Sequence, residues 1–115
     1  KGLNMAGDAS DHLARHERDI DFAKAIGSDR VIFHGGYSTG EGTHQELQNV
    51  ASSINHYLEY TKDSNLLILV ENTKMGKNKV CSDPKHLAKL LKTINHERVG
   101  ATLDIINLLG VKEEE

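Results

Sequence analysis

The feature that most restricts the fold of this chain is a set of three short apolar runs, each of which ends in a polar residue. The runs end at His34, Glu71 and Asp104. These residues are 37 and 33 positions apart, about the length of a unit of strand, helix and returning strand. Parallel strands joined by such units all point the same way, so their carboxyl ends share one rim. The pattern therefore predicts a parallel sheet with His34, Glu71 and Asp104 at one edge.

The segments between the runs are predicted to be helices. Thr43 and Glu46 match a capping box, in which each side chain bonds the other residue's backbone N–H, ahead of apolar residues spaced three and four apart. Asp83-Pro84 starts the next helix, because Pro is favoured at the first helical position. The run 66–70 has no polar alternation, which indicates a strand buried on both faces. The expected order is helix, strand, helix, strand, helix, strand.

Composition sets limits on size and environment. With 115 residues and a net charge of −3, the chain is one domain or part of one, and as a whole it is not a basic nucleic-acid-binding surface. No apolar run approaches the ~20 residues that span a bilayer, so no membrane partner is expected. The single cysteine, Cys81, excludes an internal disulfide and favours a reducing compartment, so we expect a cytoplasmic protein. The chain begins without Met and ends where a new helix can start, so we expect residues 1–115 to be a segment of a longer chain.

Two parallel architectures compete for this pattern. A doubly wound open sheet concentrates its site at one switch point, whereas a TIM barrel collects side chains from the ends of several successive strands. Three consecutive strand ends that each carry a potential ligand favour the barrel. The expected fold class is α/β, with parallel β/α units that form part of a TIM barrel, about three of its eight strands.

The residue types at the rim indicate metal chemistry. Imidazole nitrogen and carboxylate oxygen are ligands of divalent metals. A divalent-metal site made by His34, Glu71 and Asp104 is therefore the first hypothesis. The competing interpretation is that each residue only caps its strand or bonds loop backbone.

The sequence around the rim also resembles a known family. The strings Val-Ile-Phe-His-Gly-Gly at 31–36, Leu-Val-Glu-Asn-Thr at 69–73 and Arg-Val-Gly-Ala-Thr-Leu-Asp at 98–104 are similar to those of the xylose-isomerase-like barrel superfamily. The similarity is greatest to its apurinic/apyrimidinic endonuclease branch, the endonuclease IV type. It covers about residues 4–109 and corresponds to the central three or so of the family's eight units.

The resemblance implies roles for these residues. His34 would bind a zinc ion, Glu71 would bridge two metals as the central catalytic carboxylate, and Asp104 would bind the second metal. The family has a further metal-binding His where this chain has Asn107, and it usually has Pro where this chain has Gly35. Because an amide oxygen is a poor zinc ligand, fewer metals than the family's three are expected. Zinc is the first candidate and manganese the second.

The resemblance implies hydrolysis of a phosphodiester at an abasic site in DNA. Paired metals would assist that reaction, because they acidify water and clamp phosphoryl oxygens. Three further residues have both a functional and a plain interpretation. Asn72 orients Glu71 or only makes a turn. Tyr37 stacks on a sugar or base or only covers its loop. Lys74, in a lysine-rich loop, contacts phosphates or is only solvated.

Two other functions remain open. In the sugar isomerases and epimerases of the same superfamily, one divalent metal held at the Glu71 and Asp104 positions prepares a small sugar for proton transfer. Alternatively, the chain is a non-catalytic partial barrel, whose exposed strand edges must pair with the missing barrel strands or with a second copy. For the nuclease, we expect residues 1–115 alone to be inactive, because the family's remaining ligands lie outside them.

Two weaker motifs are set aside. Residues 36–40 match the nucleophile elbow of serine hydrolases, but no helix follows directly, as that motif requires. His12 and His16 lie one helical turn apart and could chelate a metal. Nothing else in their helix supports a metal site, so they are expected to lie on its exposed face.

Overall fold

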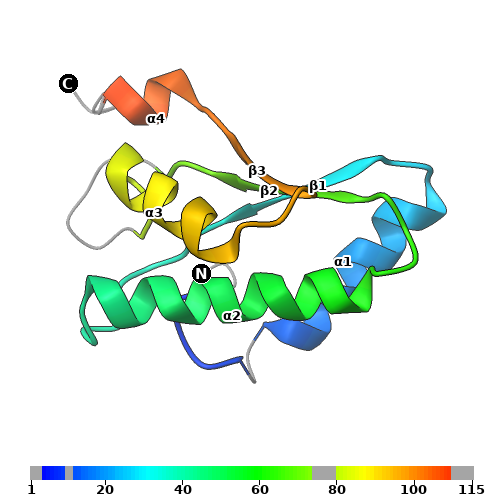
Figure 1. Ribbon diagram of the computed structural model, residues 1–115, viewed down its shortest axis with the longest axis horizontal. Coiled ribbons are helices and arrows are strands. Elements are labelled where there is room, and N and C mark those ends of the chain that lie inside the picture. The colour runs from blue at the N-terminus through cyan, green and yellow to red at the C-terminus, as the bar shows by residue number, and fades with distance from the viewer. Residues whose placement is uncertain (1–3, 10–11, 74–79, 110–115) are drawn as a thin grey trace.

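The computed structural model describes residues 4–9, 12–73 and 80–109, and its elements follow the expected order (Figure 1). The elements are α1 (Leu13–Ala25), β1 (Arg30–His34), α2 (Thr43–Tyr60), β2 (Leu67–Glu71), α3 (Pro84–Ile94), β3 (Val99–Thr102) and α4 (Ile105–Leu109). The strands form one parallel sheet in the order β1-β2-β3. The predicted α/β class and parallel arrangement are confirmed.

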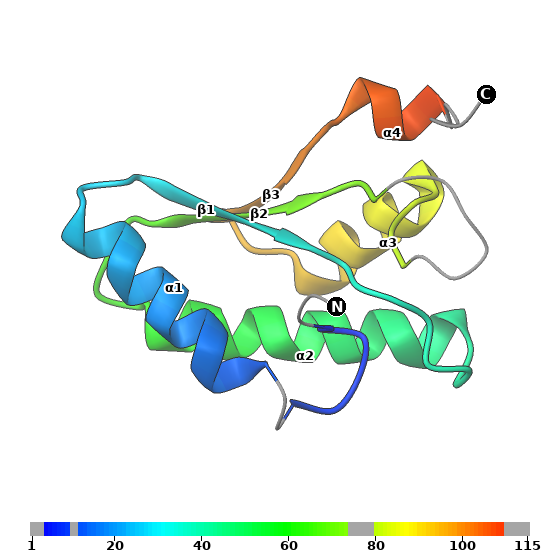
Figure 2. The same ribbon diagram turned by 180° about the vertical axis from the view of Figure 1, so that it is seen from behind.

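The helices are divided between the two sides of the sheet. In both views of the ribbon, α1 and α2 lie on one side and α4 lies on the other (Figures 1 and 2). Helix α3 packs against α2 and β3. Among the described helices, none combines the length and the apolar character that crossing a bilayer requires.

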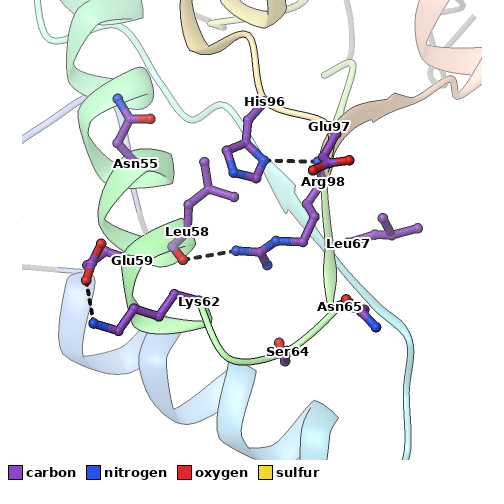
Figure 3. Close-up of a pocket in the computed structure, with 10 residues that line it drawn as sticks. All are labelled: Asn55, Leu58, Glu59, Lys62, Ser64, Asn65, Leu67, His96, Glu97 and Arg98. Carbon is purple, nitrogen blue, oxygen red and sulfur yellow. Dashed lines mark hydrogen bonds and ion pairs between the residues drawn. The ribbon is translucent and has the colours of Figure 1, made fainter.

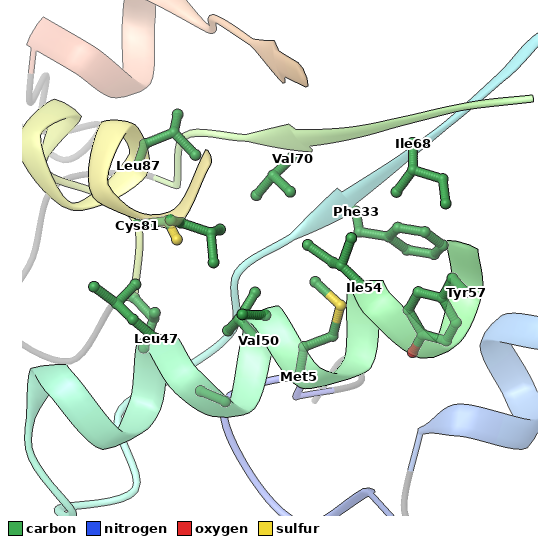
Figure 4. Packing of buried hydrophobic residues seen from close by; sticks show 14 of the residues in the cluster. Met5, Phe33, Leu47, Val50, Ile54, Tyr57, Ile68, Val70, Cys81 and Leu87 are labelled. Atoms are coloured by element: carbon green, nitrogen blue, oxygen red, sulfur yellow. The ribbon is translucent and has the colours of Figure 1, made fainter. Parts of the chain in front are cut away.

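The apolar core lies between the sheet and α2 (Figure 4). Phe33, Ile68 and Val70 come from the strands, and Val50 and Ile54 come from the helix. All five are at most 6% exposed. Burial of one aliphatic side chain of this size stabilises the fold by about 1.5–3 kcal/mol. This layer determines which face of each strand turns toward the helices.

The alternate strand residues form the other face of the sheet, which is less buried. Ile32 is 48% exposed, and Leu69, its register partner, is only half-buried. Side chains alternate between faces along a strand, so His34 and Glu71 share this face with Ile32 and Leu69. The prediction that the 66–70 run is buried on both faces therefore holds for one face, and the other is only partly covered.

Arg98, directly before β3, ties the end of α2 to the sheet. Its guanidinium donates to the carbonyl oxygens of Leu58 (3.0 Å) and Leu66 (2.9 Å) and to the hydroxyl of Thr61 (2.9 Å). A cation suits the negative end of a helix, where carbonyl groups lack partners within the helix. The arginine that begins the 98–104 string therefore serves the fold.

Helices α1 and α2 meet along a row of polar side-chain pairs. His12 Nε2 and Ser53 Oγ lie 2.8 Å apart, and His16 Nδ1 and Tyr57 Oη lie 2.6 Å apart. Because His12 and His16 are 0% and 7% exposed, the prediction of an exposed face is wrong. The physical reason is that α2 offers each ring a hydroxyl partner, which offsets the cost of burying a polar group.

Candidate metal centre

His34 and Glu71 are the last residues of β1 and β2, and they are partners in the parallel register. The His34 Nε2 and Glu71 Oε1 atoms lie 3.5 Å apart. The His34 side chain is 65% exposed and that of Glu71 is 20% exposed, so the pair is open to solvent. The structure thus brings two of the three predicted ligands together at the rim.

Asp104 lies two residues beyond β3, and its carboxylate begins α4. Its Oδ1 accepts a hydrogen bond from the backbone N–H of Asn107 at 3.1 Å, as at a helix N-cap. The backbone N–H of Asp104 donates to Asn72 Oδ1 at 2.6 Å, and Asn72 Nδ2 donates to the Asp104 carbonyl at 3.0 Å. Asp104 is therefore held firmly, with one carboxylate oxygen bonded to the helix.

Asn72 and Asn107 connect the end of β2 to α4. Asn72 is fully buried, and its backbone carbonyl accepts a hydrogen bond from Asn107 Nδ2 at 3.1 Å. The side chain of Asn72 bonds Asp104 rather than Glu71. Asn107, at the position where the resembled family has a metal-binding His, bonds backbone here.

Glu46 holds the loop that follows β1. Its Oε2 accepts hydrogen bonds from the Ser38 hydroxyl (2.8 Å), the Thr39 N–H (2.8 Å) and the Gly40 N–H (3.1 Å). The predicted capping box is wrong, because the N-cap of α2 is Gly42, one residue earlier than the box requires, and no side chain caps the helix. The carboxylate of Glu46 is therefore directed to the loop instead of to the helix start.

Val80 and Cys81, which come after β2 in the chain, pack against the same region. The Val80 N–H donates to the Gly36 carbonyl at 3.0 Å. A Cβ on Gly35 would lie 2.9 Å from both the Val80 carbonyl oxygen and Cys81 Sγ. This close approach accounts for glycine where the resembled family usually has proline. Cys81 is fully buried, and burial raises the pKa of its thiol to about 12, so it stays protonated near neutral pH.

The remaining predicted residues have different outcomes. Tyr37 is half-buried, and its backbone is bound on both sides by Asn4: its N–H donates to Asn4 Oδ1 at 2.8 Å, and Asn4 Nδ2 donates to its carbonyl at 3.1 Å. Lys74 lies outside the described residues. The sequence pattern does not single out Asn4 and suggests a different contact for Glu46, because no local pattern shows which side chains bind the loop 36–40.

The donors at the rim fit a divalent metal in kind. One imidazole and one carboxylate stand together, and a second carboxylate, Asp104, lies at the end of the next strand. Zinc binds nitrogen and oxygen donors of these types. Within residues 4–9, 12–73 and 80–109, no three His, Cys, Asp or Glu side chains are close enough together to hold an ion. Among the described residues, the rim therefore offers two neighbouring donors for a metal, His34 and Glu71.

A pocket of ≈ 710 Å³ lies at the opposite end of the sheet, where β2 begins and the chain passes from α3 to β3 (Figure 3). His96 and Arg98 are part of its lining, together with Glu59 and Lys62, whose side chains pair at 3.1 Å. Its described lining includes none of the three predicted metal ligands. The pocket is thus separate from the rim.

Comparison with known proteins identifies relatives over most of the chain. Residues 3–115 match the sequence profile of a family described as xylose isomerase-like TIM barrel. The "Probable endonuclease 4" of Staphylococcus saprophyticus is 26% identical over 89 residues, which cover 76% of this chain and 29% of that protein. The protein of the same name from Methanoculleus marisnigri is 30% identical over 80 residues, covering 69% and 28%. "Apurinic-apyrimidinic endonuclease 1" of Plasmodium berghei is 34% identical over 74 residues, covering 63% and 14%.

A solved structure shares the fold. The crystal structure of a D-tagatose 3-epimerase-like protein superposes with a TM-score of 0.79 at 23% sequence identity, covering 91% of this chain and 42% of that one. The three-stranded parallel sheet and its helices therefore correspond to part of a TIM barrel. The chain spans less than a third of the length of each of these three endonuclease relatives.

Proposed function

Because the chain belongs to the xylose isomerase-like TIM barrel family, we propose that it forms part of a metal-dependent enzyme that hydrolyses a phosphodiester at abasic sites in DNA. The observation that carries the proposal is the His34–Glu71 pair, with Nε2 and Oε1 3.5 Å apart at the rim. A ring nitrogen and a carboxylate oxygen at this separation are two donors that one divalent ion can take. The names of the three endonuclease relatives support the reaction class.

In this proposal each rim residue has a distinct task. Glu71 would be the central metal-binding carboxylate, His34 would bind through a ring nitrogen, and Asp104 would supply the second carboxylate. Zinc is the first candidate and manganese the second; when bound, such a metal would lower the pKa of water and draw charge from phosphoryl oxygens. The side chain of Asn72 keeps Asp104 in place by binding the Asp104 backbone. The exposed side of His34 leaves room for a substrate.

The partners proposed are DNA that contains an abasic site and the protein segments that complete the barrel, either from the same protein or from a second copy of this chain. The half-exposed Ile32 and Leu69 support this, because an apolar sheet face needs a cover. Residues 1–115 on their own are proposed to be a partial barrel that is inactive without the missing ligands.

Incision of an abasic-site duplex tests the proposal. The whole protein, incubated with the duplex and Zn²⁺ or Mn²⁺, is expected to cut the backbone next to the abasic site. Glu71→Gln should lower the rate by at least about 100-fold, the upper range for changes that only disturb a metal ligand. His44→Gln, on the exposed start of α2, is the matched control and should leave the rate unchanged. Equal rates for wild type and Glu71→Gln would contradict the proposal.

The second candidate is a divalent-metal-dependent sugar isomerase or epimerase of the same superfamily. The observation that favours it is Asn107, whose side chain bonds the Asn72 carbonyl at the position where the nuclease branch has a metal-binding His. This candidate predicts ketose interconversion with Mn²⁺ or Co²⁺ and no incision of abasic DNA. Activity on a ketose that is lost in Glu71→Gln would select it over the nuclease.

A further inference from the structure

The loop that leaves His34 is bound at its far end by a buried carboxylate. Glu46 is 4% exposed, and its Oε2 also accepts from the Thr39 hydroxyl at 3.3 Å, in addition to the three hydrogen bonds given above. Burial alone would raise the pKa of this carboxyl, but the hydrogen bonds from the loop outweigh it and lower the pKa below its ordinary value. Hydrogen bonds to an ionised acceptor are roughly twice as strong as neutral ones. The loop is therefore fixed by charge-assisted bonds.

The near end of the loop is bound by Asn4. Its side-chain amide forms hydrogen bonds with both the N–H and the carbonyl of Tyr37. The side-chain amide of Asn72 binds the N–H and the carbonyl of Asp104 in the same way. The separations are 33 and 32 residues, so each asparagine lies one β/α unit before the segment that it holds. Gly36, directly before Tyr37, has φ +103°, and a Cβ there would clash with Asn4 Oδ1. The backbone next to His34 thus passes directly over the Asn4 side chain.

We infer that Asn4 and Glu46 are positioning residues of the candidate metal centre, which fix the loop 35–40 and through it the orientation of His34. The inference rests on the proposed function, since it assigns His34 to a metal. Three segments from different parts of the chain converge on this loop: Asn4 before α1, Glu46 in α2, and Val80 after β2. A metal ligand must be held within about 0.5 Å of its productive position. His34 is largely exposed, so its own packing supplies little of that restraint and the loop supplies the rest.

Co²⁺ binding and amide hydrogen exchange test this inference on the chain itself. Asn4→Ala and Glu46→Ala are expected to weaken Co²⁺ binding, followed by its visible absorption, by about tenfold or more, as for other groups that orient metal ligands. Asn4→Asp keeps the acceptor for the Tyr37 N–H, so its Co²⁺ affinity should fall between wild type and Asn4→Ala. Exchange should become faster at the Tyr37 amide in Asn4→Ala and at the Thr39 amide in Glu46→Ala.

The control is Ser53→Ala, which removes the hydrogen bond to His12 between α1 and α2 and leaves the rim contacts intact. Urea unfolding measures the loss of stability in each variant, so that Co²⁺ binding is compared between test and control variants of similar stability. If Asn4→Ala and Glu46→Ala weaken Co²⁺ binding no more than Ser53→Ala does, the two residues only stabilise the loop and the inference is overturned. If wild type binds no Co²⁺, the proposed function fails and the positioning role of Asn4 and Glu46 fails with it, even where exchange shows that the two residues hold the loop.

Discussion

A buried asparagine can satisfy both polar groups of one peptide segment, because its amide carries a donor and an acceptor. Asn72 uses this property on Asp104, and its own carbonyl is bound by Asn107. These contacts give Asp104 a fixed place at the end of β3 and use one of its carboxylate oxygens to begin α4. At the residue scale, therefore, the rim is built as much by amides as by the three potential ligands. The contact of Asn107 with backbone is in line with the expectation of fewer metals than the three of the resembled family.

The Asn72 contacts predict a stability effect. Asn72→Ala removes both hydrogen bonds from the buried Asn72 side chain to the partly buried Asp104 backbone, at a net cost of about 0.5–1.5 kcal/mol for each bond and so about 1–3 kcal/mol together. The expected result is a fall of that size in the free energy of unfolding, measured by urea denaturation. Asn55→Ala, at an exposed position in α2, should change stability by less than about 0.5 kcal/mol. A similarly small change in the free energy of unfolding of both variants would show that the Asn72 contacts with Asp104 do not stabilise the fold.

At the element scale, the packing of α1 on α2 depends on neutral histidines. Burial lowers the pKa of His16 to about 4, the neighbouring His12 and Arg15 act in the same direction, and Asp19 acts against them. Burial also raises the pKa of Tyr57, the hydrogen-bond partner of His16. Both groups of this pair are therefore uncharged near neutral pH. Phe33 of β1 lies against the His16 ring, with centroids 4.5 Å apart, which leaves little room for water around a charged imidazole.

This packing predicts that acid weakens the fold through His16. In the unfolded chain the pKa returns to its ordinary value of 6.5, so below pH 6.5 the unfolded state binds more protons than the folded state. The contribution of His16 is fully present above pH 6.5 and is lost as pH falls toward 4, by about 3 kcal/mol in total. Urea unfolding at pH 7.5 and 4.5 measures the loss.

The variant comparison isolates this histidine from the carboxylates that titrate in the same range. His16→Gln is expected to lose less stability than wild type between pH 7.5 and 4.5, because glutamine does not titrate. His44→Gln, at an exposed position, should show the wild-type dependence on pH. If His16→Gln and wild type lose the same free energy on acidification, the burial of a neutral His16 is not the cause.

At the scale of the whole molecule, the features predicted from sequence are those set by local patterns. Regular spacing and apolar runs were sufficient to predict three parallel strands, and strand direction placed His34 and Glu71 at one rim. The burial of His12 and His16 was not predictable, because it depends on hydroxyl partners 41 residues away. Glu46 was assigned to the wrong contact for a different reason: its partners lie 6 to 8 residues earlier, in a loop without a repeating pattern, and two of them are backbone N–H groups. Neither kind of contact leaves a periodic trace in the sequence.

The partial barrel also limits what these residues can do on their own. One face of the sheet remains partly open, with Ile32 48% exposed, and the described donors form a pair rather than a complete ligand set. The central claim is that this pair, His34 and Glu71, is the nucleus of a metal centre. Metal binding is a more direct test of it than catalysis, because two donors can take an ion although the full ligand set that catalysis needs is not present among the described residues.

Calorimetric titration of the chain with Zn²⁺ at pH 7.5 makes that test. We expect saturable binding by wild type, at least about tenfold weaker binding by His34→Gln and by Glu71→Gln, and unchanged binding by His44→Gln. Zn²⁺ affinity that is the same in wild type and both rim variants, or no binding by wild type, would contradict the assignment of a metal centre to this rim.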